Sequence, residues 1–180
     1  MIKTHSEEII SDLEGTIIDL ETIGYFDDRY EDSRRYRKIV PIIFGFINRE
    51  GIRILCADDR GSISELKIEM LSTLDRLKKP FYAFNTDFER GVLFNSLNKK
   101  IEFGGELNLE RFESKRRVIR FLKIPNYGDP LNDNGLLCSQ YWLEGKIDWA
   151  ILHNRSCLLK ERDILFKRGF RKPDRLQLIP

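Results

Sequence analysis

The sequence predicts an α/β domain with a mixed sheet, in which a three-stranded antiparallel meander is joined by parallel strands and flanked by helices. Three observations lead to this prediction. Short apolar runs rich in β-branched residues recur through the first half of the chain, as strands require. The first three runs follow one another without an intervening helical pattern, which favours antiparallel pairing. Later runs alternate with segments of helical periodicity, which is typical of parallel crossovers.

The chain has the size and composition of a globular protein: 180 residues, of which 41% are hydrophobic and 33% charged. We expect one domain with a core of about 9–168 and an irregular C-terminal tail. The longest apolar run, 39–47, is too short for a bilayer, which takes roughly 20 residues. The first residues show no apolar signal core. We therefore expect a cytoplasmic protein with no membrane partner. The cysteines are widely spaced and predict reduced, mostly buried thiols: Cys56, Cys138 and Cys157.

The strands of the meander come first along the chain. Residues 15–20 form a short apolar run and predict the first strand. Residues 25–38 are dense in charged and aromatic side chains and predict an exposed connection. Residues 39–47 and 52–57 predict the second and third strands, and the segment 48–51 between them predicts a turn.

Helices and further strands follow the meander. Ser62 and Glu65 have the spacing of a capping box, and apolar residues at helical spacing continue from there to Leu77. Residues 81–84 predict a strand and 86–97 a second helix. The remaining chain predicts, in order, a short strand near 106–109, a basic helix over about 110–122, a loop over 124–134, and helices over 136–143 and 148–167.

The charges are unevenly distributed, although the net charge is only +2. The first 109 residues carry 16 Lys and Arg against 20 Asp and Glu, whereas the rest carries 15 against 9. An acidic half beside a basic half suits a metal site next to a phosphate-binding surface. The alternative is two solvated faces. The side chains expected to meet a phosphate backbone lie on two predicted helices: Arg111, Lys115, Arg116, Arg117, Arg120, Arg155, Lys160 and Arg162.

A pair of carboxylates, Asp19 and Glu21, lies at the end of the first predicted strand. Residues i and i+2 of a strand point to the same side, so both carboxylates face one site. Such oxygen ligands suit Mg²⁺ or Mn²⁺, and two of these ions activate a water and stabilise the leaving oxygen in phosphodiester cleavage. Asp12 and Glu14 form a similar pair upstream and are the alternative site.

A second acidic position, Glu89, ends the segment 85–89 (Asn-Thr-Asp-Phe-Glu), which opens the second predicted helix. Two explanations remain open for it. Thr86 and Glu89 have the spacing of a capping box, which is a purely structural role. The order and spacing of Glu89 after Asp19 and Glu21 favour a role as a metal ligand.

A third group lies on the last predicted helix, where His153, Cys157 and Glu161 are spaced by four residues and share one face. His153 would activate the attacking water, because the pKa of histidine is near neutrality. Glu161 would supply a carboxylate, whereas a cysteine is a poor ligand for hard cations. The alternative is a buried structural face, with Cys157 in the core and Glu161 in the charged run 160–163.

These motifs resemble those of the DEDD-type 3′–5′ exonucleases, a family of the ribonuclease H-like superfamily. Residues 19–24 (Asp-Leu-Glu-Thr-Ile-Gly) resemble the first motif of the family, and 85–93 the second. The last helix departs from the family pattern, because His153 stands where the family has a tyrosine and Cys157 where it has a metal-binding aspartate. The predicted order of strands and helices is that of the ribonuclease H-like fold.

The resemblance implies a metal-dependent exonuclease that hydrolyses phosphodiester bonds at single-stranded DNA or RNA ends with two Mg²⁺ or Mn²⁺ ions. The implied metal ligands are Asp19, Glu21, Glu89 and Glu161, and the implied catalytic residues are His153, Asp19 and Glu21. Because Cys157 replaces an acid, the alternative is a module of the same fold that binds nucleic acid or protein and has lost cleavage.

Overall fold

A computed structural model describes residues 1–111 and 113–180. Within these residues the centre is a six-stranded sheet with the strand order β1-β4-β3-β2-β5-β6. Antiparallel pairing joins β2, β3 and β4, whereas β5 runs parallel to β2 and β6 parallel to β5. The predicted α/β class and mixed sheet are therefore confirmed. The strands are β1 (Ile2–Glu7), β2 (Thr16–Gly24), β3 (Ile39–Asn48), β4 (Gly51–Ala57), β5 (Phe81–Ala83) and β6 (Gly105–Glu106).

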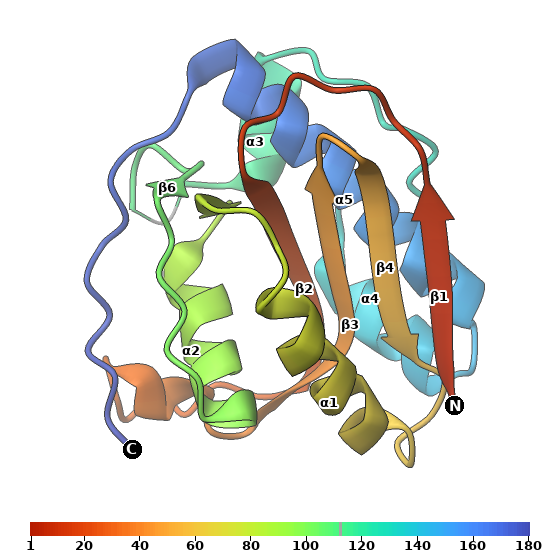
Figure 1. The fold of residues 1–180 in the computed structure, drawn as a ribbon, viewed down its shortest axis with the longest axis vertical. Helices are drawn as coiled ribbons and strands as arrows, with labels where there is room; N and C mark the ends of the chain where they lie inside the picture. The colour runs from red at the N-terminus through yellow and green to blue at the C-terminus, as the bar shows by residue number, and fades with distance from the viewer. Residues whose placement is uncertain (112) are drawn as a thin grey trace.

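Helices cover both faces of this sheet (Figure 1). On one face lie α1 (Ile63–Leu74) and α2 (Thr86–Leu97), and on the other α4 (Gly135–Leu143) and α5 (Ile147–Arg168). The short α3 (Lys115–Phe121) contacts α5, and a 3₁₀ helix, η1 (Ser33–Tyr36), contacts α2. Among the described residues, none of the helices is both long and apolar enough to cross a membrane.

The N-terminal strand β1 is absent from the sequence prediction. It pairs antiparallel with β4, from Ile2 opposite Ala57 to Glu7 opposite Ile52. Its sequence is mostly polar and lacks a continuous apolar pattern, so the backbone pairing at the sheet edge is what makes it a strand. Arg155 of α5 holds its end through a bidentate ion pair with Glu7. The sheet therefore extends the expected core of 9–168 toward the N-terminus.

Two helix starts differ from the predictions. Ser62 precedes α1, but its side chain makes no capping bond to the described part of the helix and contacts the carboxylates of Asp58 and Asp59 instead. The predicted capping box is therefore wrong. The basic helix expected over 110–122 begins only after Ser114, whose hydroxyl accepts a hydrogen bond from the backbone N–H of Arg117. Within that range, Phe112 lies outside the described residues.

The C-terminal tail is irregular, as expected, but it packs against the fold. The backbone N–H of Ser33 donates to the carbonyl of Gln177, at 2.9 Å, and the Ser33 hydroxyl donates to Ile179. The tail thereby covers η1, whose Ser33 and Tyr36 are buried. The connection 25–38, predicted to be exposed, is thus partly buried because the tail and α2 lie against it.

The sheet opens beside β2. This strand pairs with β5 only through Thr16 with Phe81 and Ile17 with Tyr82, and further on it has no strand partner on that side among the described residues. Beyond this point β5 ends and leads into α2. In open α/β sheets, ligands bind in the crevice outside the carboxyl ends of strands at such a switch in topology.

Candidate functional site

The four implied metal ligands line a single pocket of about 450 Å³ at this opening. Asp19 and Glu21 come from β2, Glu89 from α2 and Glu161 from α5. All four are nearly inaccessible to solvent, with exposed fractions of 8%, 8%, 4% and 0%. The fold thus gathers four buried carboxyl groups from three elements that are far apart in the sequence.

Asp19 and Glu21 lie within β2 rather than at its end, because the strand continues beyond both. They line the same pocket, as their i and i+2 positions predict. On the α5 side, Asn154 Nδ2 donates a hydrogen bond of 2.8 Å to Asp19 Oδ2. The alternative pair, Asp12 and Glu14, is exposed, precedes β2 and does not line this pocket.

The close approach of α5 to β2 depends on Gly45. This residue pairs with Asp19 across β2 and β3. A Cβ atom at position 45 would lie 1.9 Å from Asn154 Oδ1, so any larger residue would displace the amide that holds Asp19. Gly45 carried no functional signal in the sequence, because its role depends on a helix more than a hundred positions further along the chain.

Glu89 is not part of a helix cap. The helix α2 begins at Thr86, so that Asn85 and not Thr86 is the N-cap residue, and the Asn85 side chain makes no capping hydrogen bond. The structural explanation that the capping-box pattern offered is therefore wrong. Burial raises the pKa of Glu89 well above its usual range, and the nearby carboxyl groups of Asp19 and Glu161 add to this effect.

Lys115 at the start of α3 supplies a positive charge inside this acidic pocket. Its Nζ lies 2.5 Å from Glu161 Oε1 and 3.4 Å from Asp19 Oδ1. Burial lowers the pKa of this ammonium, but the acids outweigh burial and raise the pKa well above its usual range. The sequence placed Lys115 among the phosphate-binding residues, whereas in the structure it bridges two of the carboxylates.

Lys115 contacts only two of the four carboxyl groups. Burial raises the pKa of Glu21 to about 7, against the opposing charge of His153, and that of Glu161 to about 8, against the opposing charge of Lys115. Two buried oxygens, Glu89 Oε2 and Glu161 Oε2, have no hydrogen-bond partner among the described residues. Because unpaired buried carboxyl oxygens are unfavourable, this donor set fits a divalent cation that prefers oxygen ligands.

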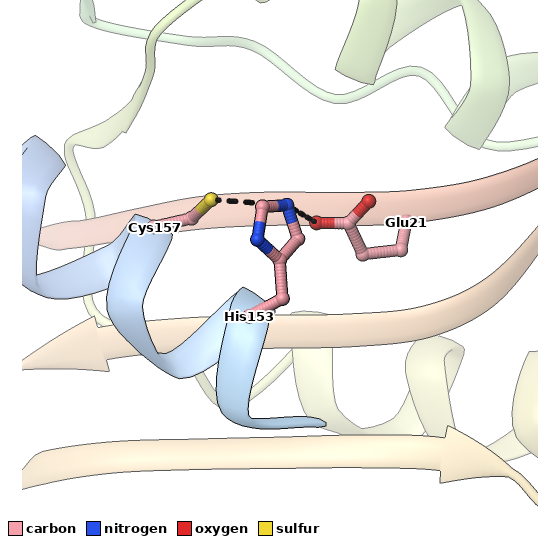
Figure 2. A group of neighbouring side chains, drawn as sticks. All are labelled: Glu21, His153 and Cys157. Carbon is pink, nitrogen blue, oxygen red and sulfur yellow. Dashed lines mark hydrogen bonds and ion pairs between the residues drawn. The ribbon is translucent and has the colours of Figure 1, made fainter. Parts of the chain in front are cut away.

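The third group surrounds His153, whose ring lies between Glu21 and Cys157 (Figure 2). His153 Nε2 is 3.6 Å from Glu21 Oε1 and 3.7 Å from Cys157 Sγ. On the other side of the ring, Nδ1 is 2.8 Å from Asp129 Oδ1. His153, Cys157 and Glu161 all line the pocket, so the face of α5 that they share is both buried and part of the site.

The expected near-neutral pKa of His153 is wrong. Burial lowers the pKa of this imidazole, but the sulfur of Cys157 and the hydrogen bond with Asp129 outweigh burial and raise the pKa to about 11. A histidine that keeps its proton at neutral pH is not available to take one from water. Burial also raises the pKa of the Cys157 thiol.

A second buried network holds the far side of His153. Asp129 accepts hydrogen bonds from the backbone N–H groups of Leu131 and Asp133, at 2.9 and 2.8 Å. Lys160 Nζ lies 2.9 Å from Asp129 Oδ2 and 2.6 Å from Asp133 Oδ1. Lys160 is fully buried, so its predicted place on a phosphate-binding surface is wrong. The sequence did not single out Asp129, because it lies in a loop without periodic pattern.

A second pocket adjoins the first and shares Phe26, Phe84, Phe88 and Lys115 with it. Its lining combines aromatic rings with basic and acidic side chains, among them Arg35. The cavity at the carboxylates thus continues into a groove with rings and charges along its walls.

No protein-family model, curated protein or solved structure matches this chain. The chemistry of the pocket and of its groove is accordingly what points to a function.

Proposed function

We propose that this protein is a metal-dependent 3′–5′ exonuclease of the ribonuclease H-like superfamily, acting on single-stranded nucleic-acid ends. The observation that carries the proposal is the convergence of Asp19, Glu21, Glu89 and Glu161 in one buried pocket. The strand order supports it. The other meander strands, β3 and β4, lie on one side of β2, and the parallel strands β5 and β6 lie on the other. The position of the pocket, where β2 and β5 part, supports it as well.

The carboxylates would hold Mg²⁺ or Mn²⁺, which these hard oxygen donors fit. When bound, such ions activate a water and stabilise the leaving oxygen of a phosphodiester. Asn154 fixes the orientation of Asp19, and burial removes water from around the acids. Lys115 partly neutralises Asp19 and Glu161, which offsets the cost of burying these two acids.

The adjoining groove offers contacts for a nucleic-acid strand. Phe26 and Phe88 are partly exposed at the junction of the two pockets, where a terminal base would stack on them. Arg35 and Arg111 line the groove and would contact phosphates without reading the sequence. Stacking and phosphate contacts of this kind tolerate any base, as an exonuclease requires.

One observation favours a second function. Lys115 already places a cation between Asp19 and Glu161, where the first function needs a metal. In the second function this ion pair is permanent, and the pocket is the centre of a module that binds nucleic acid or protein without cleaving. Cys157 points the same way, because its sulfur replaces a hard oxygen ligand.

Cleavage of end-labelled single-stranded DNA and RNA with Mg²⁺, Mn²⁺ or EDTA tests the proposal. We expect shortening from the 3′ end that requires metal and is abolished in Asp19→Asn or Glu21→Gln, which keep the side-chain shape but remove a charged ligand. Asp12→Asn is the matched control and should cleave like the wild type, since Asp12 lies outside the pocket. Binding of the strands without cleavage would support the second function. Neither binding nor cleavage would contradict both the exonuclease and a module that binds nucleic acid.

A further inference from the structure

Glu21, His153 and Cys157 bring three kinds of ligand atom close together, with the His153 ring between the other two side chains (Figure 2). A carboxylate oxygen, an imidazole nitrogen and a sulfur lie within 4.8 Å of one another. All three side chains are buried, with Glu21 on β2 and the other two one turn apart on α5. A mixed set of oxygen, nitrogen and sulfur does not suit Mg²⁺, but it is typical of zinc and similar divalent cations.

The two separations that involve His153 Nε2 are close to those of tetrahedral coordination. With Zn–N and Zn–O distances of about 2.0–2.1 Å and Zn–S of about 2.3 Å, tetrahedral ligand atoms lie about 3.3–3.6 Å apart. The observed separations are 3.6 Å from His153 Nε2 to Glu21 Oε1 and 3.7 Å from Nε2 to Cys157 Sγ. Shifts of a few tenths of an ångström would bring each of these two pairs to coordination spacing. The carboxylate oxygen and the sulfur, which lie within 4.8 Å of each other, would have to close further toward the cation.

Asp129 orients His153 as a carboxylate orients a ligating histidine in metalloproteins. Such a histidine usually donates its second ring N–H to a carboxylate or carbonyl, which directs the other nitrogen to the metal. Here Nδ1 of His153 lies 2.8 Å from Asp129 Oδ1, and Nε2 faces Glu21 and Cys157. Asp129 is itself fixed by Lys160 and by the backbone N–H of Leu131.

The cluster is open on one side, because its three residues line the 450 Å³ pocket. Structural zinc sites are closed by four protein ligands, whereas catalytic sites have three and keep a position for water or substrate. A cation held by Glu21, His153 and Cys157 would have that fourth position directed into the pocket.

We propose that Glu21, His153 and Cys157 bind one zinc-like divalent cation, with an open coordination position toward the pocket. His153 then acts as a ligand in place of the water-activating role predicted from the sequence, and Cys157 is a ligand rather than a lost aspartate. The cation takes the place of the thiol proton and of any proton on Nε2, and these protons pass to solvent. The proposal holds whether or not the protein is a nuclease.

Titration of the metal-free protein with Co²⁺ tests the site, because cobalt replaces zinc in such sites and reports its ligands by absorption. We expect a thiolate-to-cobalt charge-transfer band together with the intense visible bands of tetrahedral cobalt, saturating at one equivalent. Zn²⁺ should then displace Co²⁺ and abolish the bands, whereas an excess of Mg²⁺ should leave them unchanged.

Variants assign the bands to individual side chains. Cys157→Ser should lose the charge-transfer band. A ligating histidine that loses its hydrogen-bond partner typically weakens metal binding by ~10–100-fold. His153→Gln removes the ligand itself and should weaken Zn²⁺ binding by more than that. Asp129→Asn should keep the band and show that ~10–100-fold loss. Cys56→Ser is the matched control, since Cys56 is another buried thiol on β4 and outside the pocket.

The absence of a charge-transfer band in the wild type would overturn the site, whether or not any variant folds. A band that survives in Cys157→Ser would overturn it as well, because another cysteine would then be the thiolate ligand. Asp19→Asn separates this test from the nuclease proposal. That variant should lose cleavage yet keep the cobalt spectrum, and an inactive wild type with the full spectrum would contradict only the exonuclease.

Discussion

Neighbouring residues of the pocket differ in the cations they prefer. Asp19, Glu89 and Glu161 offer only hard oxygen, whereas Cys157 offers sulfur beside the imidazole of His153. These preferences meet within one cavity, so a single side chain can change which cation the pocket accepts. Position 157 is the natural place to test this, because it faces both Lys115 and His153.

Cys157→Asp should convert the pocket toward hard cations. An aspartate at this position adds an oxygen ligand and has two cationic neighbours, Lys115 and His153, to offset its burial. We expect Mg²⁺-dependent cleavage to rise by about tenfold, which corresponds to ~1.4 kcal/mol of barrier, while the cobalt charge-transfer band disappears. Glu161→Gln should lower cleavage in the wild type but matter less beside Cys157→Asp, since the two acids then share one role.

Cleavage rates and melting temperatures of both single variants and of the double variant are the measurement. A destabilised, inactive Cys157→Asp together with an unaffected Glu161→Gln would contradict the place given to this helix face in the site. In that case a new buried charge without a partner would be the whole effect of the aspartate.

Lys115→Met should show whether the lysine competes with metal. Removing the ammonium leaves Asp19 and Glu161 buried without their partner, which we expect to destabilise the metal-free protein by about 3–5 kcal/mol. Mn²⁺ should then raise the melting temperature of Lys115→Met more than that of the wild type, because a bound ligand stabilises the native state in proportion to its affinity. Arg116→Met, an exposed neighbour, is the control. Equal shifts in the wild type and Lys115→Met would contradict the competition.

At the scale of whole elements, α5 organises the site. It packs across β2, β3 and β4 and carries His153, Cys157 and Glu161 at intervals of one turn. The absence of a side chain at Gly45 lets Asn154 and Leu158 of α5 lie against β3, since a Cβ there would be 1.9 and 3.0 Å from their atoms. The carboxylates of β2 and the ligands of α5 therefore share a pocket only while this helix lies close to the sheet.

Gly45→Ala should disturb both stability and the site. Its methyl group would overlap Asn154 Oδ1, so we expect a loss of about 1–3 kcal/mol in the free energy of unfolding and weaker metal binding. Gly135→Ala is the matched control for stability alone, because a Cβ there meets no atom of the described residues within 4 Å but Gly135 lines the pocket. Urea unfolding and the cobalt titration measure the two effects. A Gly45→Ala protein as stable as the wild type would show that α5 is not held at this contact.

At the scale of the whole molecule, ion pairs join segments that are distant in sequence. Arg155 ties β1 to α5 through Glu7, and Arg168 ties the segment before α3 to the end of α5 through both oxygens of Glu113. Glu113 also accepts a hydrogen bond from the backbone N–H of Leu109. Glu113 thus joins the segment before α3 to the end of α5. We infer that this contact, which we call the clamp, positions Lys115 two residues later in the pocket.

The clamp makes a defined contribution to the pH dependence of stability. The hydrogen bonds from Arg168 hold the pKa of Glu113 below its usual value of 4.5. A depressed folded-state pKa stabilises the protein above the unfolded value, and this contribution is lost as the pH falls through the folded value. Arg168→Gln should therefore lower stability at neutral pH, by about 1–2 kcal/mol, and differ progressively less from the wild type below pH 4.5.

Urea unfolding of both proteins between neutral and acid pH measures this difference. The control is Lys167→Gln, which removes an exposed charge from the same end of α5. A stability gap between Arg168→Gln and the wild type that stays constant with pH would contradict the pairing.

Periodicity alone determined much of the fold, because it reports which side chains must be buried. The meander strands, the helix 86–97 and the last helix followed from their apolar patterns, with ends close to those observed. The strand β1 has no such pattern, and only its pairing with β4 makes it regular. The early start predicted for α3 was wrong because Glu113 is held by Leu109 and Arg168 instead of extending the helix.

For the site, the sequence determined which side chains of one element face the same way. The i and i+2 carboxylates of β2 and the four-residue spacing on α5 are local geometry, and both hold in the structure. Only the tertiary structure decided which side chains contact them. Lys115 pairs with the acids, Asp129 contacts Nδ1 of His153, and Lys160 is buried against Asp129. A charged residue in a helix or loop looks the same in sequence whether it faces solvent or a buried partner, because its partner is chosen by packing across the sheet.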